Sequence, residues 1–146
     1  MPAPSDSDPP AAWLLKTEPG SYSFQDLVRE RKAVWDGVTN PVALRNLRAM
    51  RAGDRVVIYH TGDEKSAVGF GKVTRAAYPD PKRGDDRLVV VEVEAGSALP
   101  RPVTLAALKA EKVFAESPLA RQGRLSVVPL TRPQLAALEA LARAKS

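Results

Sequence analysis

The chain has 146 residues, of which 44% are hydrophobic and 27% are charged, and its net charge is +5. A chain of this length and composition can bury the core of a single domain. It contains no cysteine, which excludes disulfides, thiolate metal sites and a cysteine nucleophile. A single histidine provides no histidine cluster for a metal ion. The excess of positive charge favours a polyanionic partner such as nucleic acid.

The first residues, 1–11, are mostly Pro, Ala, Ser and Asp. They lack the basic start and the apolar run of a signal peptide, and no stretch of the chain has the length and apolarity of a membrane span. We therefore expect a disordered tail over residues 1–11 and one domain over residues 12–146. A chain without cysteine suits the reducing cytoplasm, where we expect this protein. We also expect a monomer that needs no metal or other cofactor.

A strand and a short helix are predicted near the start of the domain. The apolar run Trp13–Thr17 predicts a strand, which ends at the turn formed by residues 18–20. Ser23 and Asp26 have the spacing of a capping box, in which each side chain accepts a hydrogen bond from the other's backbone N–H. This pair predicts a helix over residues 24–31.

A second helix is predicted over residues 41–50. Asn40 is a favourable N-cap, and the proline that follows it suits the first helical position. Arg45, Arg48 and Arg51 follow at three-residue spacing on a face away from the apolar positions. These arginines form either an ordinary solvated face or a surface that holds the phosphates of a nucleic acid.

Three strands are predicted in the middle of the chain, at residues 55–60, 67–76 and 87–95. Because the loops between them are short, an antiparallel meander is expected. Gly69 and Gly71 lie on one face of the second strand. Glycines in such positions indicate the close approach of a neighbouring backbone or a bend in a barrel.

The last third of the chain alternates between short helices and one strand. The pattern predicts, in order, a helix at 104–110, one helical turn within 113–122 and a strand at 124–130. Thr131 and Gln134 form a second capping box, which begins a helix that continues to about Ala144. Because helices and strands do not alternate as βαβ units, we expect the α+β class, with a small mixed sheet that closes into a barrel surrounded by helices.

Trp35 stands out because it lies beside the turn signal Asp36-Gly37 and shortly before the second helix. A large ring in this place either fills the core or forms the wall of a pocket for a flat ligand, and the residues alone leave both readings open. An aromatic ring beside a basic helix is typical of proteins that bind bases, in which stacking contributes about 1–3 kcal/mol per base.

His60 is the residue that suggests catalysis. It ends a strand beside Tyr59 and could act as an acid–base pair with Asp36 or Glu18, or in a Ser-His-Asp site with Ser126. We favour a hydrogen-bonding structural role, and therefore a protein that is not an enzyme, because no nucleophile elbow, P-loop or dinucleotide-binding loop accompanies it. A protein-interaction module is a further alternative.

Seven segments together resemble the EVE domain family, a PUA-like family related to the YTH domains. In chain order they are residues 13–19, 35–40, 50–54, 59–60, 69–73, 77–80 and 124–130. The resemblance covers about residues 12–141 and implies a PUA-like mixed β-barrel with surrounding helices. It also implies a nucleic-acid-binding module that recognises a modified base, of the methylated-cytosine type in DNA or a modified base in RNA.

The resemblance also suggests site residues. In the YTH domains an aromatic cage holds the methylated base, and one cage tryptophan matches Trp35. Tyr59 and His60 are the candidates for the remaining wall. The candidates for polar contacts to the ligand are Lys16, Thr17, Glu18, Asp36, Asn40 and Ser126, and Arg45, Arg48 and Arg51 are the candidates for contacts to the nucleic-acid backbone.

Overall fold

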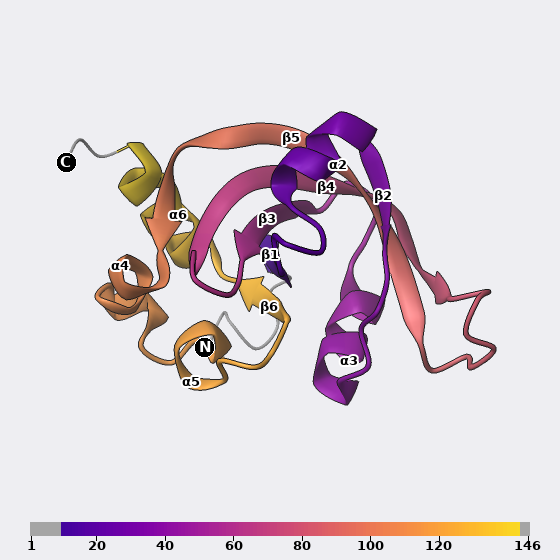
Figure 1. Ribbon diagram of the computed structural model, residues 1–146. Coiled ribbons are helices and arrows are strands. Elements are labelled where there is room, and N and C mark those ends of the chain that lie inside the picture. Colours follow the sequence, from indigo (N-terminus) through magenta and orange to yellow (C-terminus); the bar gives the residue numbers. More distant parts are fainter. Residues whose placement is uncertain (1–9, 144–146) are drawn as a thin grey trace.

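The computed structural model describes residues 10–143, which fold around one mixed β-sheet (Figure 1). Its strands lie in the order β2-β5-β4-β3-β1-β6. They are β1 (Ala12–Thr17), β2 (Lys32–Trp35), β3 (Arg55–His60), β4 (Ser66–Pro79), β5 (Val89–Thr104) and β6 (Val127–Leu130). Residues 1–9 of the predicted tail lie outside the described residues, whereas the Ala11 N–H already donates to the Leu130 carbonyl at 2.8 Å.

The pairing of the strands confirms the predicted meander and the α+β class. β3 pairs antiparallel with β4, and β4 pairs antiparallel with β5. β1 lies between β3, to which it is parallel, and β6, to which it is antiparallel. Parallel neighbours need a long connection, and residues 18–54 supply it. The predicted barrel is not confirmed, because within residues 10–143 β2 and β6 are the two edges of an open sheet.

The helices begin where the capping signals placed them. They are α2 (Phe24–Glu30), α3 (Pro41–Ala49), α4 (Leu105–Lys109), the 3-10 turn η1 (Lys112–Phe114), α5 (Pro118–Arg121) and α6 (Arg132–Arg143). The reciprocal bonds of both predicted capping boxes are present, between Ser23 and Asp26 and between Thr131 and Gln134. Asn40 Oδ1 accepts hydrogen bonds from the first turn of α3. No described helix has the length and apolarity needed to cross a membrane.

Two glycines of β4 allow neighbouring parts of the fold to approach closely, as predicted. A Cβ at Gly69 would overlap the ring of Phe24, which is 3% exposed, and a Cβ at Gly71 would lie 2.7 Å from the carbonyl oxygen of Glu94 on β5. Phe24 belongs to α2, which lies over β4 in Figure 1, and Glu94 belongs to the neighbouring strand β5. Close packing at this point holds α2 against the sheet.

Two features of the sheet differ from the prediction. β2 was missed, because it is a four-residue edge strand that follows a run of charged residues and gives little periodic signal. β5 continues past the predicted end to Thr104, through Pro100 and Pro102. Prolines are accepted there because β2 pairs with β5 only as far as Glu94, which leaves the later part of β5 paired along β4 alone.

Candidate functional site

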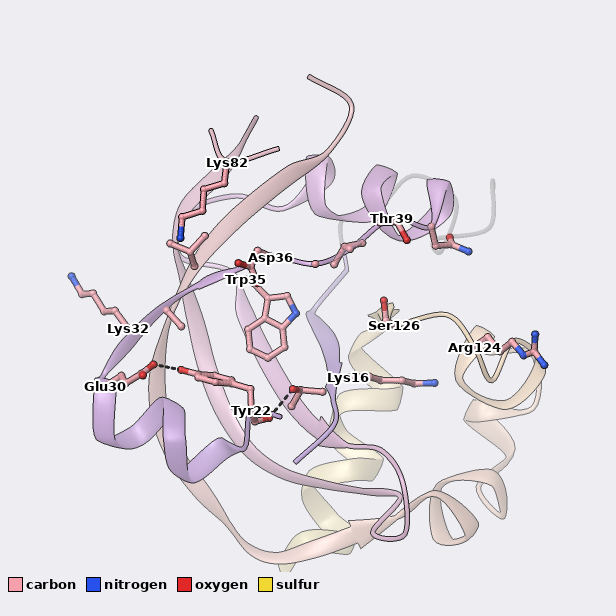
Figure 2. Close-up of a pocket in the computed structure, with 16 residues that line it drawn as sticks. Lys16, Tyr22, Glu30, Lys32, Trp35, Asp36, Thr39, Lys82, Arg124 and Ser126 are labelled. Atoms are coloured by element: carbon pink, nitrogen blue, oxygen red, sulfur yellow. Dashed lines mark hydrogen bonds between the residues drawn. The ribbon is translucent and has the colours of Figure 1, made fainter. Parts of the chain in front are cut away.

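A pocket of about 870 Å³ opens between β2, the segment that follows it, and the junction of β1 with β6 (Figure 2). Its walls come from parts of the chain that are distant in sequence. The lining residues are Lys16, Thr17, Tyr22, Glu30, residues 32–40, Lys82, Arg124 and Ser126. Pockets of this volume are in the range that holds small ligands and cofactors.

Trp35 belongs both to the core and to the pocket wall. It ends β2, pairs with Val91 of β5, and is 8% exposed. The Tyr22 ring meets it edge to face, with ring centroids 6.2 Å apart and an interplanar angle of 83°. The two readings of this residue are therefore compatible, because most of the indole is packed and its remaining surface faces the pocket.

Tyr22 is a pocket residue that the sequence reasoning missed. Its hydroxyl donates to Glu30 Oε1 at 2.6 Å, and its carbonyl accepts from Thr17 Oγ1 at 2.7 Å. Burial raises the pKa of the Tyr22 phenol well above its ordinary value, and the hydrogen bond to Glu30 raises it further. The phenol is therefore a neutral donor held in place. Its sequence signal was an aromatic residue just after the turn at residues 18–21.

Lys16 and Ser126 lie side by side because β1 pairs with the end of the segment that leads into β6. The backbone N–H of Lys16 donates to the Ser126 carbonyl at 2.9 Å, and Lys16 Nζ donates to the Gly123 carbonyl at 2.9 Å. Burial lowers the pKa of the Lys16 ammonium, and the positive charge of Lys109 lowers it further. The surroundings thus disfavour the charged form of Lys16, and a ligand with an anionic or electron-rich atom beside Nζ would stabilise that form.

The predicted residues Asp36 and Asn40 both line the pocket, on the segment that follows β2. Gly37 between them adopts a φ of 80°, which fits the predicted turn. Asn40 Oδ1 is already used, because it accepts from the N–H groups of Val42 and Ala43. Its amide nitrogen Nδ2 remains as a donor to a ligand. The exposed Asp36 carboxylate is an acceptor at the rim.

Arg83 fixes the rim of the pocket from a distant loop. Both of its terminal nitrogens donate to the Val38 carbonyl, at 3.2 and 3.1 Å, and its Nε donates to Asp80 Oδ2 at 3.1 Å. The Asp80 carboxylate also accepts from the backbone N–H of Lys82. That bond and the Arg83 guanidinium hold the pKa of Asp80 below its ordinary value. This arrangement positions residues 36–40 and places Lys82 beside them.

We expect Arg83→Gln to lower the free energy of unfolding by about 1–2 kcal/mol and to weaken ligand binding, because the charged donor to the Val38 carbonyl is lost. Urea denaturation followed by fluorescence measures the stability. Arg87→Gln is the matched control on the same loop, since Arg87 pairs with Asp85 but its side chain is 85% exposed. It should cost less than about 0.5 kcal/mol, and equal losses for both variants would contradict the role of Arg83.

Three of the residues predicted to contact the ligand do not line this pocket. The Glu18 carboxylate accepts from the Gly20 N–H in a local turn. The Tyr59 ring is 3% exposed and lies behind the pocket wall, under Lys16 Nζ at 5.6 Å from the ring centroid. His60 is also buried. Tyr59 and His60 were expected to form the second wall of the pocket. The structure instead places the ring of Tyr22 beside Trp35.

His60 has a structural role in this fold. Its Nε2 accepts the backbone N–H of Phe24 at 2.9 Å, and its Nδ1 lies 2.9 Å from Glu64 Oε1. Nε2 is therefore the unprotonated nitrogen, and Nδ1–H donates to Glu64. Neither Asp36 nor Glu18, the two expected acid–base partners, is bonded to the ring among residues 10–143. The histidine satisfies the first N–H of α2, which has no partner within the helix.

The basic residues of the pocket are not the predicted arginines of α3 and of the turn that follows it. Arg45, Arg48 and Arg51 are exposed on the surface, and Arg48 Nη2 donates to the Arg87 carbonyl at 2.9 Å. The cations that line the pocket are Lys16, Lys32, Lys82 and Arg124. All but Lys16 were missed, because their positions depend on how β2, the 80–86 loop and the segment before β6 come together.

The family model of the EVE domain matches residues 11–141. The chain belongs to the EVE domain family. Thymocyte nuclear protein 1 of Mus musculus is 31% identical to this EVE domain, in an alignment that covers 84% of this chain and 69% of that protein.

Solved structures agree with this assignment. The protein Rpa0253 of Rhodopseudomonas palustris superposes with a TM-score of 0.85 at 38% identity, over 90% of this EVE domain and 92% of that chain. Human THYN1, solved in complex with DNA that contains 5-methylcytosine, superposes with a TM-score of 0.85 at 27% identity, over 92% of this domain and 99% of that chain. The shared fold therefore includes a relative that was solved with DNA containing a modified base.

Proposed function

We propose that this EVE domain binds nucleic acid that carries a modified base, and that the base enters the pocket at Trp35. The observation that carries the proposal is the pocket itself, where two aromatic rings meet four cationic side chains. The human relative bound to DNA containing 5-methylcytosine supports a methylated cytosine as the first ligand to test. A metal-dependent reaction is not part of the proposal.

The pocket provides the interactions that extraction of a base requires. Removing a base from a duplex costs a few kcal/mol, and one aromatic contact of about 1–3 kcal/mol barely offsets this cost. Hydrogen bonds to the base and contacts to phosphates must supply the rest. The volume of about 870 Å³ exceeds that of one planar base, so the sugar and its phosphates have room at the rim.

The charges of the rim are arranged for a phosphate backbone. Lys32, Lys82 and Arg124 are exposed, and they lie around the opening in Figure 2. Arg124 has no ion pair among residues 10–143, whereas Arg121 nearby pairs with Glu116 at 3.0 Å. We propose that Arg124 and Lys82 contact phosphates beside the flipped base. The arginines of α3 remain candidates for a continuation of this path.

The proposal is tested by titrating the domain with paired oligonucleotides, one with a single 5-methylcytosine and one unmodified, in DNA and in RNA of the same sequence. We expect a preference for the modified strand, and equal affinity for all four would contradict the proposal. The comparison between DNA and RNA identifies the polymer. Size-exclusion chromatography with light scattering tests the predicted monomer, and the cytoplasmic setting stays a prediction.

Salt dependence separates phosphate contacts from base contacts. We expect Arg124→Gln to weaken binding of modified and unmodified strands by the same factor and to reduce the slope of log K against log[salt] by about 1. Arg45→Gln on α3 is the comparison. A reduction of its slope would extend the phosphate path to α3, and an unchanged slope would confine the path to the pocket rim.

A further inference from the structure

The indole N–H of Trp35 has no hydrogen-bond partner among residues 10–143, although 92% of the residue is buried. No fully buried side-chain nitrogen or oxygen of these residues lacks a partner. Nε1 of Trp35 therefore reaches open space, and the space beside it is the pocket. The other tryptophan behaves differently, because Trp13 Nε1 donates to Asp54 Oδ2 at 3.1 Å.

The direction of this N–H is visible in Figure 2. The indole nitrogen points across the pocket toward the side where Ser126 and Lys16 lie, and away from Glu30. Lys16 Nζ carries three donor hydrogens, of which one is directed to the Gly123 carbonyl. The hydroxyl of Ser126 makes no side-chain hydrogen bond to residues 10–143. Hydrogen-bond donors thus collect on one side of the pocket.

The small exposure of Trp35 bears on how it contacts a ligand. Stacking needs an open ring face, whereas the T-shaped contact with Tyr22 and the surrounding core leave only 8% of Trp35 exposed. Nε1 is among the atoms that keep access to the pocket, because no fully buried side-chain nitrogen of residues 10–143 lacks a partner. A ligand that fills the pocket removes water from this donor, and an unpaired buried donor is unfavourable.

We propose that Trp35 selects the ligand through a hydrogen bond from Nε1–H to an acceptor atom of the bound base. The class of ligand is a planar heterocycle that presents a carbonyl oxygen beside a ring nitrogen, as on the acceptor edge of a cytosine-type pyrimidine. Lys16 and Ser126 contact the same edge. A site built to donate to such atoms discriminates strongly against a ring that lacks them. This inference rests on the proposed function.

The test replaces the N–H and keeps the ring. Site-specific substitution Trp35→3-benzothienylalanine exchanges the nitrogen for sulfur with nearly the same shape. We expect it to bind a duplex with one 5-methylcytosine about five- to tenfold more weakly than wild type, the effect of one hydrogen bond. The same substitution at Trp13 is the matched control, because that N–H is already bonded to Asp54, and we expect unchanged affinity in the folded protein.

Nuclear magnetic resonance gives a second readout, since the two tryptophans of the chain yield two indole N–H signals. Addition of the modified duplex should move the Trp35 signal downfield and slow its exchange with water, and should leave the Trp13 signal in place. Equal affinity of wild type and Trp35→3-benzothienylalanine, or an unmoved Trp35 signal at saturation, would overturn the inference while the proposed function stands. Failure of wild type to bind any modified strand would instead remove the proposed function.

Discussion

Trp35→Ala is expected to abolish most of the preference for a modified base. Loss of the indole removes both the Nε1–H donor and the aromatic surface that borders the base, together worth about 1–3 kcal/mol, which corresponds to a factor between about five and more than a hundred in the dissociation constant. Because Trp35 is 8% exposed and part of the core, the same change should lower the free energy of unfolding by about 3–5 kcal/mol. Fluorescence anisotropy with modified and unmodified oligonucleotides measures the preference.

The loss of stability must be separated from the loss of binding. Trp35→Phe keeps an aromatic ring and should cost less stability, while it removes the indole N–H. Binding is measured at a temperature at which circular dichroism shows each variant to be folded. A folded Trp35→Ala protein that still prefers the modified strand would exclude Trp35 from the site.

Gly69→Ala is expected to destabilise the fold, although it adds a single methyl group. The added methyl group would overlap the ring of Phe24, and neither group can move aside, because Phe24 is buried and its backbone is bonded to His60. Overpacking of this kind costs about 1–3 kcal/mol, and sometimes more. Urea denaturation with a linear extrapolation measures the change.

Two further variants show whether the overlap is the cause. Gly123→Ala adds the same methyl group where no heavy atom lies within 4 Å, so its stability should stay close to that of wild type. Phe24→Leu shortens the ring and should recover part of the loss in the double variant with Gly69→Ala. A double variant as unstable as the sum of the single changes would show that the two positions do not interact.

Local signals predicted much of the fold because their partners are close in the chain. The capping boxes join residues three positions apart, and both formed as expected. The meander of β3, β4 and β5 follows from short loops between strong strands. β2 was missed because an edge strand of four residues is stabilised by its pairing with β5 rather than by its own pattern.

The candidate site was predicted in part, because its remaining contacts connect distant residues. Lys16 and Gly123 are 107 positions apart, and Arg83 and Val38 are 45 positions apart. Contacts at such sequence separations leave no periodic pattern in the sequence from which they could be predicted. The hydrogen-bonding role favoured for His60 agrees with its contacts, because its two ring nitrogens bind Phe24 and Glu64, whereas its absence from the pocket wall depended on distant parts of the chain and was not foreseen.

The antiparallel pairing of β1 with β6 has a consequence for synthesis of the chain. A nascent chain from which residues 123–130 have not yet left the ribosome already contains Trp35 and Tyr22. It still lacks the wall formed by Arg124 and Ser126 and the Gly123 carbonyl that accepts from Lys16 Nζ. Contacts between residues that are far apart in the sequence form late in folding. The pocket is therefore completed only when β6 pairs with β1, and a nascent chain without β6 lacks part of the pocket wall.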